Sequence, residues 1–193
     1  GLPDRHYRAM VQGAANHIWI GFEEGGLWQG TEGHFEPWHA IENFDPQSPV
    51  RSLHADRDGG VWIGIWGNGL AHIKGERMVV YSMANGLADP RVTALCEDSS
   101  GLLWVGTQGG LLQSWDGHQF STLSRLDGLP GQPILCLLAD TNGSVWAGTD
   151  GGGVANCSRR GVSSHFLGGA KAVSLCRDGR GQLWVGTEGQ GLG

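Results

Sequence analysis

The sequence has little positive charge and no long apolar run. Thirteen Lys and Arg stand against nineteen Asp and Glu, a formal net charge of -6, so no basic field is available to attract nucleic acid or an anionic membrane. The longest apolar run, Ile134–Ala139, has six residues, far fewer than the roughly 20 needed to cross a bilayer. The opening residues 1–4 lack the basic and apolar regions of a signal peptide. We expect neither nucleic acid nor a membrane to contact this segment.

The spacings typical of metal and redox sites are also missing. Eight His are present, but no His-x-x-x-His or Cys-x-x-Cys spacing occurs, so we expect no metal, no cofactor and no catalytic residue. Catalytic groups brought together from distant segments would leave no linear motif. An enzyme, a lyase or a hydrolase, therefore stays as an alternative.

Glycine and tryptophan are in excess. Glycine supplies 35 of 193 residues, against an ordinary share of about 7%, yet no three-residue period or Pro/Ser-rich tract accompanies it. Of nine Trp, five recur at intervals of 43, 42, 42 and 38 residues: Trp19, Trp62, Trp104, Trp146 and Trp184. This interval is that of four-stranded propeller blades.

Other residues repeat with these five Trp. Asp stands six residues before the last four, and Gly three residues before them; the first repeat has Gly13 and Asn16 instead. An Asp-x-x-Gly segment suits a short hairpin turn, and a large indole suits the wedge between packed sheets. Gly at this density costs a helix roughly 1 kcal/mol per position. The sequence predicts an all-β propeller with four full antiparallel blades of about 42 residues, a partial fifth, and five core Trp.

The string Asp-x-x-Gly-x-Leu-Trp-Val-Gly-Thr-x-x-Gly-Gly-Leu is clearest in residues 98–111 and resembles the two-component regulator propeller repeat. The resemblance covers residues 1–193 as one segment in five copies, with a Gly-Leu-Pro-like link between blades, as at Gly128-Leu129-Pro130. The first two copies depart, with Phe22 and Ile65 in the Thr position. The resemblance implies the periplasmic sensor region of a bacterial histidine kinase or diguanylate cyclase, with dimerisation through the full-length sensor.

The fifth repeat covers only about half a blade. An open arc would leave unpaired strand edges, so we expect a fragment of a larger propeller, for example one with seven blades. A five-bladed ring is the alternative.

The four Cys are expected to be small buried fillers. Cys96 and Cys176 stand eight residues before their Trp, Cys136 lies two residues earlier in its repeat, and Cys157 lies on another strand. In a rotational array these positions do not meet, and a disulfide needs Cα atoms within about 7 Å.

A ligand is expected at the axial mouth, where the turns that enter each inner strand meet the turns that follow each Trp. Cations dominate the first row, eleven or thirteen residues before a Trp: His6, Arg8, Arg51, Arg91 and Lys171. The second row, four residues after a Trp, is Glu23, Trp66, Gln108, Asp150 and Glu188. Trp66 is expected to be an exposed platform that packing does not require. This mixture suits a polar small molecule or an oligosaccharide, and a solvated rim is the alternative for each residue.

Three functions follow from these observations. The first is a ligand-sensing module of a two-component system, the second a non-catalytic interaction scaffold, and the third a propeller enzyme.

Overall fold

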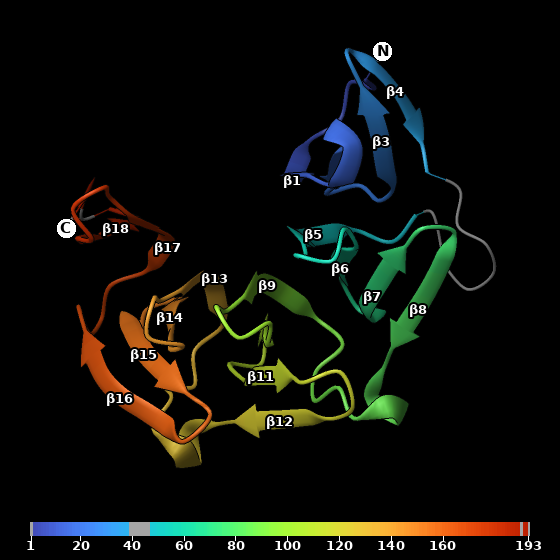
Figure 1. Ribbon diagram of the computed structural model, residues 1–193. Helices are drawn as coiled ribbons and strands as arrows, with labels where there is room; N and C mark the ends of the chain where they lie inside the picture. Colours follow the sequence, from blue (N-terminus) through green and yellow to red (C-terminus); the bar gives the residue numbers. More distant parts are fainter. Residues whose placement is uncertain (1, 39–46, 190, 193) are drawn as a thin grey trace. The chain divides into compact units, whose positions relative to one another are not determined.

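The computed structural model describes residues 2–38, 47–189 and 191–192, and strands dominate them (Figure 1). The chain forms two compact units, Gly1–Val92 and Thr93–Gly193. Helix in the described residues is limited to three 3-10 turns: η1 (Ala14–Asn16), η2 (Met83–Asn85) and η3 (Arg125–Asp127). No helix among them has the length and apolar character needed to span a bilayer. The all-β prediction is confirmed.

Unit 1 contains two four-stranded antiparallel sheets whose strands pair in chain order. The first sheet comprises β1 (Tyr7–Gln12), β2 (Ile18–Phe22), β3 (Leu27–Thr31) and β4 (His34–Pro37). The second comprises β5 (Val50–Ala55), β6 (Val61–Ile65), β7 (Gly69–Lys74) and β8 (Arg77–Tyr81). The strands β1 and β5 pack against each other, as expected when the first strand of each sheet is the innermost.

Unit 2 contains the other three sheets. One comprises β9 (Val92–Glu97), β10 (Leu103–Thr107), β11 (Leu112–Trp115) and β12 (Phe120–Leu123). The next comprises β13 (Ile134–Ala139), β14 (Val145–Thr149), β15 (Val154–Ser158) and β16 (Gly161–Phe166). The last has three strands, β17 (Ala172–Arg177), β18 (Leu183–Thr187) and β19 (Gly191–Leu192). Four complete sheets and a partial fifth match the predicted blades.

The Asp-x-x-Gly segments form the predicted hairpin turns. In the third sheet, Asp98 Oδ1 accepts hydrogen bonds from the backbone N–H groups of Ser100 and Leu102. The turn glycine, Gly101, has a φ of 90°, which a side chain would strain. In the first sheet Asn16 takes this position with a φ of 60°, because Asn tolerates the left-handed region better than most residues.

The Trp side chains pack onto the following sheet. Trp19 belongs to a cluster with Val61 and Ile63 of β6, and Trp104 to one with Val145 and Ala147 of β14. This arrangement explains why one large ring per repeat suffices to fill each wedge.

The prediction that all five repeat Trp are core is wrong for the last one. Trp19, Trp62 and Trp104 are buried, and Trp146 is partly buried against the fifth sheet. Trp184 is 38% exposed, because no sheet among the described residues covers that face of β18. Cys176 is exposed on the same sheet, which corrects its prediction as a buried filler.

The other three thiols fit the filler prediction. Cys96 and Cys157 are buried and Cys136 is half-buried, and none forms a disulfide. Burial raises the pKa of Cys136 and of Cys157 to about 12. These thiols therefore stay protonated at neutral pH and are poor nucleophiles.

A cross-sheet ion pair in unit 2 supports the fourth Trp. Arg177 Nη2 lies 2.9 Å from Asp140 Oδ1, and Arg177 Nη1 donates to the Gly181 carbonyl at 2.7 Å. Asp140 Oδ2 accepts from the Trp146 indole N–H at 2.9 Å. Arg177 therefore ties β17 to the carboxylate that orients Trp146.

Replacing Arg177 by Ala should lower the free energy of unfolding by about 1 to 2 kcal/mol, since it leaves a largely buried carboxylate without its cation. Urea unfolding followed by circular dichroism measures this loss. The matched control is Arg159→Ala, which removes a looser pair with Asp116 at 3.7 Å and should cost less than about 0.5 kcal/mol. Equal losses for the two variants would contradict a structural role for Arg177.

Candidate functional site

The two predicted rows of residues lie side by side at one end of four of the five sheets. In four sheets, the backbone N–H four residues after the Trp donates to the carbonyl thirteen residues before it. The pairs are Glu23 to His6, Trp66 to Pro49, Asp150 to Pro133 and Glu188 to Lys171, with N–O distances of 2.9 to 3.0 Å. The strand that enters the sheet and the turn that leaves β2, β6, β14 or β18 are thus joined there, as the spacing predicts.

In unit 1 the side chains of these rows form a cluster around Arg51. Glu23 Oε1 lies 2.6 Å from Arg51 Nη2, and Glu23 Oε2 lies 3.7 Å from Arg8 Nε. The Arg51 guanidinium carbon lies 4.6 Å from the centre of the Trp66 ring, which is within cation–π range. Two arginines thus share the single carboxylate of Glu23, Arg51 also covers the Trp66 ring, and the cluster carries net positive charge.

The Arg51 Nε–H is buried, and no residue that the structure describes accepts a hydrogen bond from it. A buried donor without an acceptor is unfavourable by about 1 to 3 kcal/mol. This cost makes Arg51 the member of the cluster best suited to gain from an added acceptor.

Trp66 is not the freely exposed platform expected from the sequence. It is half-buried, and Arg51 lies over its ring. In the other sheets the residue at this position is polar. Comparing the repeats therefore could not predict that Arg51 would cover the Trp66 ring. The expectation that the indole lies outside all packing is corrected accordingly.

Arg91 and His6 have partners of their own. Arg91 is joined to Trp66 by an isolated backbone bridge, but its guanidinium pairs with both oxygens of Asp89 at 3.0 Å, and this contact raises the pKa of Arg91. His6 Nδ1 bonds Glu24, and the hydrogen bond raises the pKa of His6 and lowers that of Glu24. Their side-chain hydrogen bonds within the described residues thus go to Glu24 and Asp89 rather than to the Arg51 cluster.

In unit 2 the predicted residues form a smaller, acidic group. Lys171 Nζ lies 2.5 Å from Glu188 Oε2 and 3.9 Å from Asp150 Oδ1. The hydrogen bond that Lys171 donates to Glu188 raises the pKa of Lys171. Gln108 is half-buried at the equivalent position after β10 and joins none of these residues of its unit. This group, with two carboxylates for one ammonium, suits donors rather than anions.

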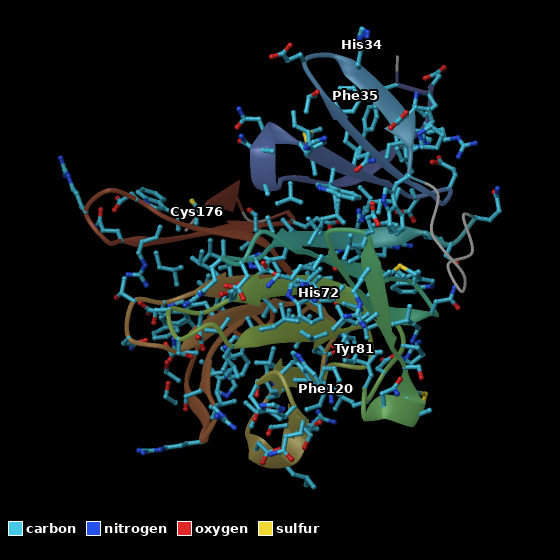
Figure 2. The ribbon with its side chains drawn as sticks, turned by 45° about the vertical axis from the view of Figure 1, so that its right-hand side comes forward. His34, Phe35, His72, Tyr81, Phe120 and Cys176 are labelled. Carbon is cyan, nitrogen blue, oxygen red and sulfur yellow. The ribbon has the colours of Figure 1, made fainter. Side chains whose placement is uncertain are left out.

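The sequence did not predict a role for the polar side chains that pair across the strands with the repeat Trp. The cross-strand partners of Trp19, Trp62, Trp104 and Trp146 are Gln29, His72, Ser114 and Asn156. These four residues are of different types, so the repeat pattern does not reveal that they occupy equivalent positions. The register of the strands is needed to show it. His72 stacks on Trp62 with ring centres 4.0 Å apart, and its Nε2 lies 2.6 Å from Asp56 Oδ2. Figure 2 shows His72 beside Tyr81 in the second sheet.

A metal site is not indicated in the part of the chain that the structure describes, where no group of three or more His, Cys, Asp or Glu could hold an ion.

Solved structures share the fold. The extracellular domain of a hybrid two-component system of B. thetaiotaomicron superposes with a TM-score of 0.85 at 20% identity, over 100% of this chain and 28% of that one. Virginiamycin B lyase of Staphylococcus aureus gives 0.76 at 14% identity, over 95% and 64%. PorZ, a surface component of the type-IX secretion system of Porphyromonas gingivalis, gives 0.73 at 19%, over 95% and 31%.

The sequence itself places the chain in a family. It spans under a third of the two-component system domain that it resembles, and no curated protein matches it. The family model described as the two component regulator propeller matches residues 45–67, 86–109, 128–151 and 167–189. These matches cover the repeats around Trp62, Trp104, Trp146 and Trp184. The chain therefore belongs to the two-component regulator propeller family.

Proposed function

We propose that this propeller segment senses a polar ligand for a bacterial two-component system, and that the ligand is an oligosaccharide. Family membership supports the signalling role. The fold is shared with an extracellular domain of such a system, which supports a periplasmic or extracellular location. In this proposal the output domain, a histidine kinase or diguanylate cyclase, lies elsewhere in the full-length protein, which dimerises.

The Arg51 cluster carries the ligand proposal. An oligosaccharide offers hydroxyl oxygens that accept from arginine and flat apolar faces that pack on an aromatic ring. The cluster supplies both kinds of partner in Arg8, Arg51 and Trp66, and the buried Arg51 Nε–H is a donor still without an acceptor. The axial mouth is the proposed place of binding, through the ends of the sheets that carry the two rows.

Two other functions remain as alternatives. A non-catalytic scaffold would use the same sheet ends to bind a protein rather than a sugar. A propeller enzyme is suggested by the lyase of similar fold, but an identity of 14% carries the fold alone. The Arg51 cluster favours binding, since it offers two cationic side chains and one aromatic face to a ligand.

Trp66→Ala and Arg51→Ala test the proposed site. Saturation-transfer NMR with cellohexaose and mannohexaose as probes should show binding to the unmodified chain. Each substitution should weaken it at least about tenfold, the effect expected from losing one stacking or charged contact. Trp115→Ala is the matched control: Trp115 is another half-buried Trp, packed on Phe120 with ring centres 4.6 Å apart, and should leave binding unchanged. Binding that survives Trp66→Ala, or the failure of both probes to bind, would refute the oligosaccharide site.

A further inference from the structure

The first repeat lacks the carboxylate that orients the Trp in the last three repeats. In the last three sheets, the Asp six residues before the Trp accepts a hydrogen bond from the indole N–H. The pairs are Trp104 with Asp98 at 2.9 Å, Trp146 with Asp140 at 2.9 Å and Trp184 with Asp178 at 3.1 Å. Gly13 stands at this position before Trp19. The repeat thus has a carboxylate position that is empty of side chain in the first sheet.

The indole N–H of Trp19 has no acceptor within residues 2–38, 47–189 and 191–192. Trp19 is only 8% exposed, yet none of the described residues accepts a hydrogen bond from its Nε1. A Cβ on Gly13 would lie 3.0 Å from Trp19 Nε1, so the glycine leaves free the space beside this donor. The N–H is not one of the fully buried unpartnered atoms of the described residues, so it faces the space beside Gly13, where a charged acceptor can replace water.

A hollow opens at this N–H. Trp19, Val61 and Ile73 line its apolar part and His17 and Gln29 its polar part, in a volume of about 270 Å³. The small residues Ala14 and Ala15 form its wall next to Gly13. An acceptor can therefore reach the indole without displacing a bulky side chain.

A second hollow of about 500 Å³ shares His17 and Gln29 with the first. The strand register explains the shared residues, because Gln29 of β3 is paired with Trp19 on one side and with Glu36 of β4 on the other. His34 and Phe35 line the second hollow, at the β3–β4 hairpin (Figure 2). We name the two adjoining hollows together the Trp19 groove, and the larger one alone has the volume of a small-molecule site.

We propose that the Trp19 groove binds a small hydroxylated monocarboxylic acid, of about the size of one sugar ring. Its carboxylate would accept from the Trp19 indole N–H and so take the place of the Asp that the last three repeats supply. Gln29 and His34 can donate to and accept from hydroxyl groups. Glu36 accepts from hydroxyl donors and disfavours a second carboxylate at its end of the groove. This site is separate from the Arg51 cluster and does not depend on it.

The indole N–H resonance of Trp19 reports on this site directly. Each of the nine Trp gives one indole signal in a nitrogen–proton correlation spectrum, and Trp19→Phe identifies the one that belongs to Trp19. Glucuronate should shift this signal saturably and downfield, because a charged acceptor strengthens the hydrogen bond. Glucose, which has the same ring but no carboxylate, should bind at least roughly tenfold more weakly.

Gly13→Asp is the decisive variant. Gly13 has a φ of -92°, which any residue adopts, but a Cβ there lies 3.0 Å from Trp19 Nε1. The Trp19 ring therefore has to shift by a few tenths of an ångström before the new carboxylate can accept from its N–H. The Trp19 signal should then lie downfield without ligand, and glucuronate should no longer shift it. Gly13→Ala, which places only a methyl group beside Nε1, provides a second block if the Asp variant folds poorly. Trp66→Ala should leave the glucuronate response intact, which separates this site from the oligosaccharide site.

Three results would overturn the proposal. The first is a Trp19 signal that does not respond to glucuronate. The second is an equal shift of this signal by glucose. The third is that both Gly13 variants bind glucuronate as well as the unmodified chain does.

Discussion

Replacing Trp104 by Ala is expected to lower the free energy of unfolding of unit 2 by about 3 to 5 kcal/mol, the range for large core aromatics. Trp104 is 1% exposed and packs in one cluster with Val145, Ala147 and Cys157 of the next sheet. Its loss opens a cavity between two sheets and leaves Asp98 without the indole donor. Urea unfolding followed by near-ultraviolet circular dichroism measures the change.

Trp184→Ala is the matched control for this experiment. Trp184 occupies the same repeat position and donates to Asp178 as Trp104 donates to Asp98, but it is 38% exposed. Its replacement should cost about 1 kcal/mol, because much less apolar area leaves contact with protein. Similar losses for the two variants would show that the hydrogen bond, rather than packing on the next sheet, sets the contribution of the repeat Trp.

The fold could be predicted from the sequence because one pattern is written five times. Each copy combines a turn signal, a strand and a large ring, and only a four-stranded sheet satisfies all three within about 42 residues. The repeat pattern does not predict whether each Trp ring packs on the preceding or on the following sheet. Trp104 packs on the sheet that follows it, and this direction depends on the twist between sheets, which no single repeat encodes. The exposure of Trp184 was missed for that reason.

The candidate site was only partly predictable. Repeat spacing correctly placed Glu23 beside His6 and Glu188 beside Lys171, because these contacts are made by backbone atoms. Side-chain partners depend on rotamers. Arg51 crosses to Glu23 and covers Trp66, whereas Arg91 turns back to Asp89. Two arginines of the same row therefore differ in role, and no spacing rule separates them.

The repeat Asp shows how a correct prediction can be incomplete. The sequence predicts that this Asp bonds the backbone of its own turn, and Asp98 Oδ1 does so. The other oxygen, Oδ2, accepts from Trp104 Nε1 at 2.9 Å. That second bond spans six residues across the hairpin, and it depends on how the strand after the turn is oriented. Because of this bond, the presence of Gly13 at the Asp position of the first repeat means that Trp19 lacks the carboxylate acceptor that Trp104 has.

Asp98 should therefore be the most sensitive polar residue of the third sheet. Asp98 is buried and accepts from the N–H groups of Ser100 and Leu102, the Ser100 hydroxyl and the Trp104 indole. Asp98→Ala should lower the free energy of unfolding by about 2 to 4 kcal/mol, because it leaves two buried donors, the Leu102 N–H and the Trp104 indole N–H, without an acceptor. Asp98→Asn keeps one acceptor oxygen and should lose roughly half as much.

The pH dependence of the Asp98→Asn effect tests whether the charge matters. Burial acts to raise the pKa of Asp98, but the hydrogen bonds from Ser100, Trp104 and Leu102 outweigh it and hold the pKa below its usual value. A carboxyl whose pKa is lower in the folded state stabilises the fold above its unfolded pKa of about 4. This contribution is lost as the pH falls through the folded pKa. The stability difference between the unmodified chain and Asp98→Asn should therefore be largest at neutral pH and shrink in that acidic range. A difference that stays constant from neutral to strongly acidic pH would show that Asp98 acts by shape and hydrogen bonding alone.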